Sequence, residues 1–312
     1  MSSLLTTFQF PIFFTIVWTT CSVTALGFYL SKLLSLQASP HLPTLFLGTF
    51  LFYSVNRWIP DPADPLNNRP AVSPLTRRFL GINSLLCLLL LLLYILFRHD
   101  PIALITIPVV GVVTLGYFIP VPGLHIRLKD IPLLKSFLPP IFITGAALLY
   151  PAWRFSTIPW TATLFLTFWL FLSLLQNVCL CDLRDQNGDH AHGVQTLALL
   201  LSSKTLTHLL ILLPILALAS LLFLFWFSDS HMSPTSILLF PAAILSLSQI
   251  LLAFLHPHIT SRMVLDWVND GLLTLPWIVL LVRQHITAAG SADVLVSKFS
   301  FFEQTLFAPA VM

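Results

Sequence analysis

The chain is built largely from apolar runs of about 20 residues, separated by short segments that carry Pro, Asp and Arg. A run of this length allows one helix to cross the ~30 Å hydrocarbon core of a bilayer. A membrane β-barrel would instead alternate apolar and polar residues over segments of about 10 residues, and the chain shows no strong alternation of that kind. The runs therefore predict an all-α membrane protein, because backbone polar groups inside a bilayer must be satisfied within helices.

The small number of charged residues excludes a soluble protein. Charged residues make up 9% of the 312 residues and apolar residues 57%, whereas soluble domains carry about 25% charged residues to hydrate their surface. The net charge is +3 and the basic residues are scattered. This pattern provides no basic surface for a nucleic acid, so we expect a lipid bilayer and no nucleic-acid partner.

We expect nine transmembrane helices, packed as a bundle around a central cavity. Residues 1–10 form a short cytoplasmic N-terminus, residues 11–283 the transmembrane domain, and residues 284–312 a C-terminal tail to which no role is assigned. The nine apolar segments are residues 11–35, 41–59, 79–97, 101–119, 134–153, 159–181, 205–227, 233–255 and 266–283.

The basic residues predict which face of this bundle is cytoplasmic. Ten of the 15 Lys and Arg residues lie in or beside the even-numbered connections, and five lie on the opposite face. Because cytoplasmic loops carry an excess of Lys and Arg, the even connections and the N-terminus should be cytoplasmic. With nine crossings the C-terminus would then lie outside.

The acidic residues cluster on the same face. Eight of the 12 carboxylates lie there, although carboxylates contribute little to membrane orientation and so need another reason to gather. They are Asp61, Asp64, Asp130, Asp182, Asp185, Asp189, Asp266 and Asp270. Carboxylates mixed with cations at one mouth of a bundle suit the binding of a metal-complexed anion.

The first polar segment follows the second apolar run and contains Asn56, Asp61 and Asp64. Pro60, Pro62 and Pro65 flank the acids, and they should form a stiff turn that presents both carboxylates in one direction. Carboxylate and amide oxygens are hard ligands of the kind that Mg²⁺ takes. An ordinary Pro- and Asp-rich turn is the alternative interpretation.

The second polar segment follows the sixth apolar run and contains Asn177, Asp182, Asp185 and Asp189. If the helix continues, the three aspartates share one face, and their mutual repulsion favours a bound cation. A solvated helix end is the alternative. At a membrane interface these acids should contribute little to packing, so Asp185 and Asp189 should matter for metal binding and not for folding.

The third polar segment, after the fourth apolar run, contains Tyr117, Pro120, Arg127, Lys129 and Lys135. Basic residues that alternate with apolar ones at an interface can simply anchor a helix by snorkelling. A binding role becomes the better interpretation because all three polar segments open on the same face.

Together the three segments resemble the UbiA superfamily of intramembrane prenyltransferases. The similarity lies in four features of that family: nine transmembrane helices, an Asp-rich motif after helix 2, a Tyr-x-x-Pro followed by Arg-x-Lys after helix 4, and a second Asp-rich motif after helix 6. Residues 177–196 resemble the second motif closely, including Gly188-Asp189 and Gly193-x-x-Thr196. The resemblance extends over roughly residues 10–283.

The first motif departs from the family pattern. Asp61 and Asp64 are three residues apart, whereas the usual spacing is four, and the Arg-Pro pair comes early as Arg69-Pro70. The chain is therefore a divergent member by this resemblance. If these acids still bind a metal, they must turn toward Asn56 and face Asp185 across the cavity.

The resemblance implies a Mg²⁺-dependent transfer of an isoprenyl group from its diphosphate to a lipophilic, aromatic acceptor. The catalytic residues would be Asp185, Asp189 and Lys129. The Mg²⁺ ligands would be Asn56, Asp61, Asp64, Asp182, Asp185 and Asp189. The substrate-binding residues would be Arg127, Tyr117, Asn177, Arg69 and Asp270.

Two alternatives remain open. Asp266 and Asp270 could orient the acceptor or accept a proton, or they could equally cap the helix that begins the ninth run. An ion-coupled transporter is the alternative function, because intramembrane carboxylates often mark ion pathways. That function would favour charges near the bilayer midplane and an internal repeat, whereas here the acids lie at one interface and no repeat is evident.

Overall fold

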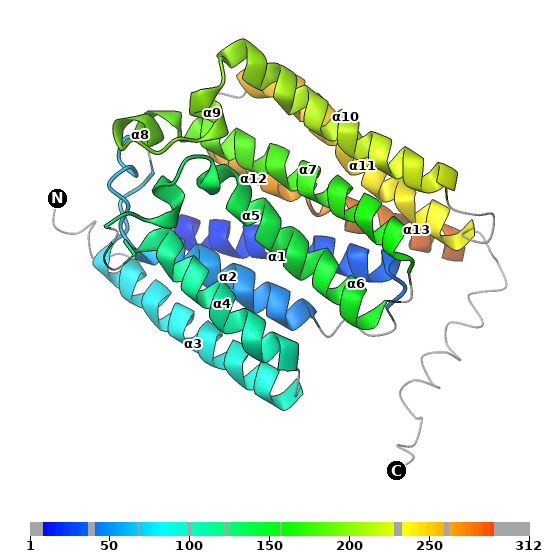
Figure 1. Ribbon diagram of the computed structural model, residues 1–312, viewed down its shortest axis with the longest axis horizontal. Helices are drawn as coiled ribbons and strands as arrows, with labels where there is room; N and C mark the ends of the chain where they lie inside the picture. Colours follow the sequence, from blue (N-terminus) through cyan, green and yellow to red (C-terminus); the bar gives the residue numbers. More distant parts are fainter. Residues whose placement is uncertain are drawn as a thin grey trace.

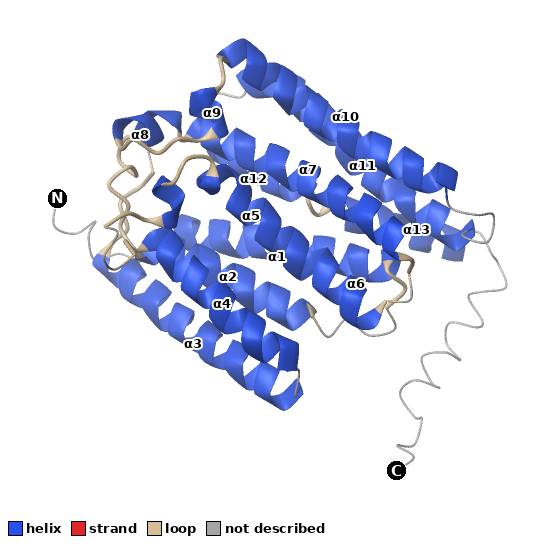
Figure 2. Ribbon diagram, viewed as in Figure 1, coloured by secondary structure: helices blue, strands red, loops and turns tan. Residues whose placement is uncertain are grey.

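The computed structural model describes residues 9–36, 41–67, 69–98, 101–121, 123, 125–156, 158–227, 233–258 and 262–289. The described residues contain helices and loops and no strand, which confirms the all-α prediction (Figure 2). The proposed N-terminal segment, apart from Gln9 and Phe10, and the tail beyond residue 289 lie outside the described residues.

Each of the nine apolar segments is largely helical over its described residues, apart from some residues at the segment ends and Leu273 and Thr274 in the last segment. The long helices are α1 (Phe10–Leu33), α2 (Leu42–Trp58), α3 (Pro74–Arg98), α4 (Pro101–Phe118), α7 (Trp160–Arg184), α10 (Ser203–Phe227) and α11 (Ser233–Leu255). The fifth segment combines α5 (Leu134–Thr144), the π-helical turn η2 (Gly145–Leu149) and α6 (Tyr150–Phe155). The remaining elements are η1 (Leu128–Asp130), α8 (Gln186–Ala191), α9 (Leu197–Leu200), η4 (His256–His258), α12 (Arg262–Leu272) and α13 (Leu275–Ala289).

In the part of the chain that the structure describes, five helices are long and apolar enough to cross a membrane: residues 10–33, 74–98, 134–154, 160–184 and 203–226. The last of the nine apolar segments, residues 266–283, is not one straight helix. α12 and α13 meet at an angle of 58° at the break around Leu273 and Thr274. If this bent pair is one span, six segments of the described chain could cross, so the structure supports a multi-pass membrane protein.

The helices run side by side, with α1 and α7 in the middle of the bundle (Figure 1). α2 and α3 pack on one side of this middle layer, and α10 and α11 on the other. Across the second side, the Gln176 amide donates to the carbonyls of Leu210 and Gln249, and the Gln249 amide donates to the carbonyl of Ser173. These bonds join α7 to α10 and α11 where the packing is otherwise apolar.

The three polar connections gather at one end of the bundle, the left end in Figure 1. Proline sets where the first of them begins. Ile59 precedes Pro60 and has extended backbone angles (φ −82°, ψ 120°), since a proline disfavours the helical conformation of the residue before it. α2 therefore ends at Trp58, and residues 62–67 form turns.

Candidate functional site

A pocket of about 480 Å³ lies at the end of the bundle where the polar connections meet. Every residue to which the sequence assigned a role lines it, although these residues come from the helices α2, α4, η1, α7, α8 and α12 and from the loops between them. They are Asn56, Asp61, Asp64, Arg69, Tyr117, Arg127, Lys129, Asn177, Asp182, Asp185, Asp189 and Asp270. The fold therefore brings together segments that are more than 100 residues apart in the chain.

The second acidic segment is buried, which excludes a solvated helix end. Asp182, Asp185 and Asp189 have exposed fractions of 2%, 2% and 3%. The helix does not continue through them as the sequence suggested, because α7 ends at Arg184 and Asp185 lies in a turn before the short α8. All three side chains still line the pocket, since the turn keeps α8 beside the end of α7.

Lys135 compensates two of these buried carboxylates. Its Nζ lies 2.5 Å from Asp189 Oδ2 and 3.6 Å from Asp182 Oδ1, and the Ser136 hydroxyl donates to Asp182 Oδ2 at 2.5 Å. Burial nevertheless raises the pKa of Asp189 above the ordinary value of an aspartate, despite the nearby Lys135 ammonium. The sequence placed Lys135 in the third polar segment but gave it no role at the site.

The first acidic segment forms the turn that its prolines predicted. The Asp61 side chain accepts a hydrogen bond from the Ala63 amide at 3.1 Å, and the Asp61 carbonyl accepts one from the Asp64 amide at 3.0 Å. Both carboxylates line the pocket. Asn56 lines it as well and lies two residues before the end of α2. The three-residue spacing therefore does not prevent the two acids from sharing a site.

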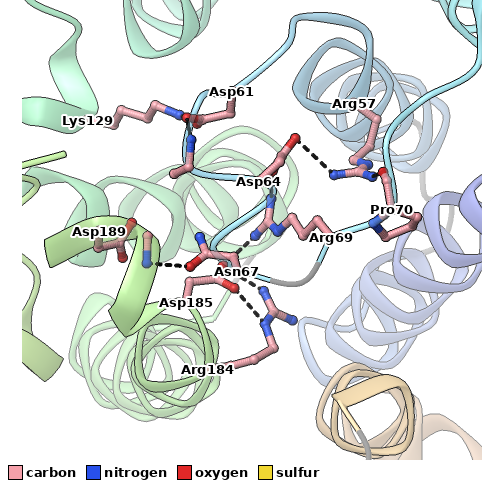
Figure 3. Close-up of polar contacts among 12 residues, drawn as sticks. Arg57, Asp61, Asp64, Asn67, Arg69, Pro70, Lys129, Arg184, Asp185 and Asp189 are labelled. Carbon is pink, nitrogen blue, oxygen red and sulfur yellow. Dashed lines mark hydrogen bonds and ion pairs between the residues drawn. The ribbon is translucent and has the colours of Figure 1, made fainter. Parts of the chain in front are cut away.

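Arg69 connects the first acidic segment with the second (Figure 3). One terminal nitrogen of its guanidinium lies 3.5 Å from Asp64 Oδ1, and the other forms an ion pair with Asp185. Arg57 also contacts Asp64, at 3.4 Å, and Arg184 contacts Asp185 at 2.9 Å. The Arg69 guanidinium therefore bridges Asp64 and Asp185, which the sequence predicted to face each other. Each of these two acids contacts two arginines.

The third segment supplies two more cations. Lys129 is buried and forms an ion pair with Asp61. Burial by itself raises the pKa of Asp61, but the Lys129 ammonium, the Ala63 amide and the Arg127 guanidinium together outweigh this effect and hold the pKa at about 2. The Arg127 guanidinium donates to both oxygens of Asp130 and lies 3.5 Å from Asp61. The segment is therefore part of the pocket and does not act only as an interfacial anchor.

Asp266 and Asp270 do not cap α12. The helix begins at Arg262, and no acidic residue lies in its first turn. Asp266 instead forms an ion pair with Arg184, and the Thr19 hydroxyl donates to Asp270 Oδ2 at 2.5 Å. Both acids line the pocket, so of the two alternatives the structure supports the one in which they face the cavity.

Aromatic side chains form part of the pocket wall beside these charges. Phe52 packs against Tyr117 with ring centroids 5.8 Å apart and against Tyr53 at 5.6 Å. Trp267 lines the same pocket from α12. The pocket thus combines a charged end with aromatic faces, which attract positive charge.

The pocket offers oxygen donors that suit Mg²⁺, although no group of three or more His, Cys, Asp or Glu side chains within the described residues is arranged to hold a metal ion. Mg²⁺ usually keeps several waters and binds through one or two carboxylates together with substrate phosphates, so it does not need an all-protein cage. Asp182 and Asp189, which share one lysine, fit this requirement.

Comparison of the chain with known protein families, with curated proteins and with solved structures finds no match.

Proposed function

We propose that this protein is a Mg²⁺-dependent prenyltransferase of the UbiA kind, which transfers an isoprenyl group from its diphosphate to a lipophilic, aromatic acceptor within the membrane. The observation that carries the proposal is the convergence of three polar segments on one pocket. Acids from residues 61–64 and 182–189 meet cations from residues 127–135 there. Mixed charge of this kind beside aromatic walls fits a substrate with an anionic head and an apolar chain.

Some charged residues of the pocket would bind the metal, and others would bind the diphosphate. Mg²⁺ would neutralise the charge that grows on the leaving diphosphate. Asp182, Asp185 and Asp189 would hold it on one side, and Asn56, Asp61 and Asp64 would contribute on the other. Because these acids now pair with internal cations, a bound metal would replace Lys135 or an arginine, and the released cation would become available to the diphosphate.

The remaining assigned residues would bind the diphosphate directly or contact the organic parts of the substrates. Lys129 and Arg127 would contact the diphosphate as cationic clamps, and Arg69 would do so once released from Asp185. Tyr117 and the other aromatic residues would shield the allylic cation from water. Asn177 and Asp270 would contact the acceptor.

The proposed arrangement in the membrane has nine spans, with the N-terminus and the Asp-rich loops in the cytoplasm. It rests on the nine apolar segments and on the ten-to-five distribution of basic residues between the two faces. The pocket would then open toward cytoplasmic Mg²⁺ and diphosphate, while the isoprenyl chain enters from the bilayer.

A transfer assay with purified protein in lipid nanodiscs tests the function. The protein is mixed with Mg²⁺, with radiolabelled geranyl, farnesyl or geranylgeranyl diphosphate, and with a membrane lipid extract as the source of acceptors. We expect a labelled, Mg²⁺-dependent lipid product that chelation abolishes and whose mass identifies the acceptor. Movement of intact diphosphate or ions across proteoliposomes without any product would support a transporter instead.

Variants of the second acidic segment complete this test. Asp185→Asn and Asp189→Asn should each lower transfer by about 100-fold or more, because metal ligation and stabilisation of the leaving group are lost. Asparagine is preferable to alanine here, since these acids are buried and paired and alanine would leave cations uncompensated. Wild-type turnover in the double variant would remove the second segment from the mechanism.

A further inference from the structure

Asp270 differs from the other aspartates of the pocket in forming no ion pair within the described residues. Within the described residues, no Lys or Arg forms an ion pair with Asp270, although it lines the pocket. The other six pocket aspartates each form at least one ion pair: Asp61, Asp64, Asp182, Asp185, Asp189 and Asp266. Arg184 acts on Asp270 only at longer range, because its guanidinium pairs directly with Asp185 and Asp266, so the carboxylate of Asp270 is not held in an ion pair.

The neighbours of Asp270 hold the carboxylate in place without neutralising it. The Thr19 hydroxyl on α1 donates to Oδ2 at 2.5 Å. The Asn177 amide on α7 is 3.5 Å from Oδ1, at the limit of a hydrogen bond, and donates a shorter bond of 3.1 Å to the Asn269 carbonyl. Three helices thus position Asp270, and Oδ1 keeps the greater capacity to accept a proton.

Asp270 lies deeper along the bundle than the acids that would hold the metal. Its neighbour Asn177 precedes Asp185 by eight residues on α7, which is continuous from Trp160 to Arg184. A rise of about 1.5 Å per residue places Asn177 roughly 12 Å from Asp185 along the helix axis. A diphosphate at Asp185 and Asp189 would therefore leave its first isoprenyl carbons, and the acceptor, near the level of Asp270.

We propose that Asp270 is the general base that takes up the proton displaced from the acceptor during prenyl transfer. This inference rests on the proposed function. The bond between isoprenyl C1 and the diphosphate oxygen breaks, and its electron pair leaves with the diphosphate. A carbon of the aromatic acceptor forms the new bond to C1 and loses its hydrogen as a proton to Asp270 Oδ1, which restores the aromatic ring.

The absence of a directly paired cation is what suits Asp270 to this role. Positive charge develops first on the allylic group and then on the acceptor ring, and a carboxylate outside any ion pair stabilises both. A carboxylate already paired with Lys or Arg has much of its charge cancelled, as at Asp266 with Arg184. Thr19 is a positioning residue, because it would act only by holding Oδ2.

The experiment separates binding of the diphosphate from transfer. Wild-type protein and the variants Asp270→Asn, Asp270→Glu and Thr19→Val are placed in nanodiscs with Mg²⁺ and radiolabelled geranylgeranyl diphosphate, and binding is measured first. Transfer to the lipid extract is measured next. Thr24→Val is the matched control for Thr19→Val, because the Thr24 hydroxyl donates to the carbonyl of Thr20 in its own helix and does not line the pocket.

We expect Asp270→Asn to bind the diphosphate with the wild-type Kd and to lose transfer by about 100-fold or more, the usual contribution of a general base. Asp270→Glu should recover part of the transfer rate, since it restores the base. Thr19→Val should lower kcat and leave the KM for the diphosphate unchanged, whereas Thr24→Val should behave as wild type.

Two results would overturn the inference. Wild-type transfer by Asp270→Asn would show that no base is needed at this position. Parallel loss of binding and transfer in both Asp270 variants would assign Asp270 a structural role. If the wild-type protein neither binds the diphosphate nor transfers it, the proposed function fails and this inference fails with it.

Discussion

At the scale of single residues, the pocket holds its acids in two different ways. Asp64 and Asp185 each contact two arginines, and Arg69 is common to both. Asp182 and Asp189 instead share the single ammonium of Lys135. A lysine on a flexible stem is displaced more easily than a guanidinium held at both ends, so an incoming divalent cation should bind first at the Lys135 side.

Removal of the Arg69 charge should make the pocket bind Mg²⁺ more tightly. In Arg69→Gln the acids Asp64 and Asp185 lose a shared cation, so the negative potential at the pocket rises. The metal-free protein should lose about 1–3 kcal/mol of stability, because two largely buried carboxylates become less well compensated. Thermal unfolding in detergent with and without Mg²⁺ measures both effects as shifts in Tm.

Arg98→Gln is the matched control for that substitution. Arg98 ends α3, is exposed and does not line the pocket. It should change neither the Tm without metal nor the shift caused by Mg²⁺. An equal Mg²⁺-induced shift in Arg69→Gln and wild-type protein would contradict the bridging role of Arg69.

The ion pair of Asp61 and Lys129 should make stability depend on pH in the acidic range. The pKa of Asp61 is about 2 in the folded protein and about 3.9 in an unfolded chain. Its contribution is therefore fully present above the unfolded value and is lost as the pH falls toward 2. The difference in Tm between wild type and Asp61→Asn should be largest near neutral pH and shrink below pH ~4. A constant difference from neutral pH to pH ~3 would contradict this assignment.

At the scale of elements, one glycine allows the two acidic segments to pack together. The Asn67 side-chain oxygen accepts a hydrogen bond from the Gly188 amide at 2.7 Å, which ties the first polar loop to α8. A Cβ added at Gly188 would collide with the amide group of Asn67. Residue 188 is therefore glycine because a side chain has no space there. Backbone conformation is not the reason, since its backbone angles are not in the left-handed region.

Gly188→Ala should push the first polar loop away from α8 and destabilise the protein by about 1–3 kcal/mol, through overpacking and a lost hydrogen bond. Because the loop carries Asp61 and Asp64, Mg²⁺ affinity should fall as well. Gly48→Ala is the control, since a Cβ in that part of α2 meets nothing within 4 Å. It should be neutral or slightly stabilising, because alanine favours helix more than glycine does. Equal Tm values for the two variants would contradict the packing argument.

At the scale of the whole molecule, the ion pairs lie at one end of an otherwise apolar bundle. The bundle's outer face carries exposed Leu and Phe side chains, as on α3 and α10, which suits contact with lipid. The proposed orientation places the charged end in the cytoplasm.

Cysteine labelling in intact cells tests that orientation. In a background without the four native cysteines, single cysteines at Leu66 and His190 should resist a membrane-impermeant reagent added from outside, and a cysteine at Arg98 should react. Both polar-loop positions are exposed on the protein, so protection would come from the membrane. The proposed orientation also applies to Asn68 and to the tail beyond residue 289, but both lie outside the described residues. Labelling of His190→Cys from outside would reverse the proposed topology.

Much of the fold follows from local patterns that the sequence displays directly. Apolar length predicts the helices, because a bilayer requires it. Pro60 predicts where α2 ends, because proline restricts the residue before it. The residues to which the sequence assigned a role also line the pocket, since charged side chains are costly in lipid and must gather where the segments open together.

Other features were decided only by the tertiary structure, because they depend on contacts between distant segments. The break between α12 and α13, the end of α7 at Arg184 and the contact of Asn67 with Gly188 have no unambiguous local signal. The choice of which cation pairs with which acid was likewise decided only by the tertiary structure. Sequence spacing cannot tell which cation will reach which acid, since the energy of an ion pair depends on distance and burial in the folded chain. Only the packing of α1, α7 and α12 around the pocket left Asp270 outside any ion pair of the described residues while the other pocket aspartates each gained one.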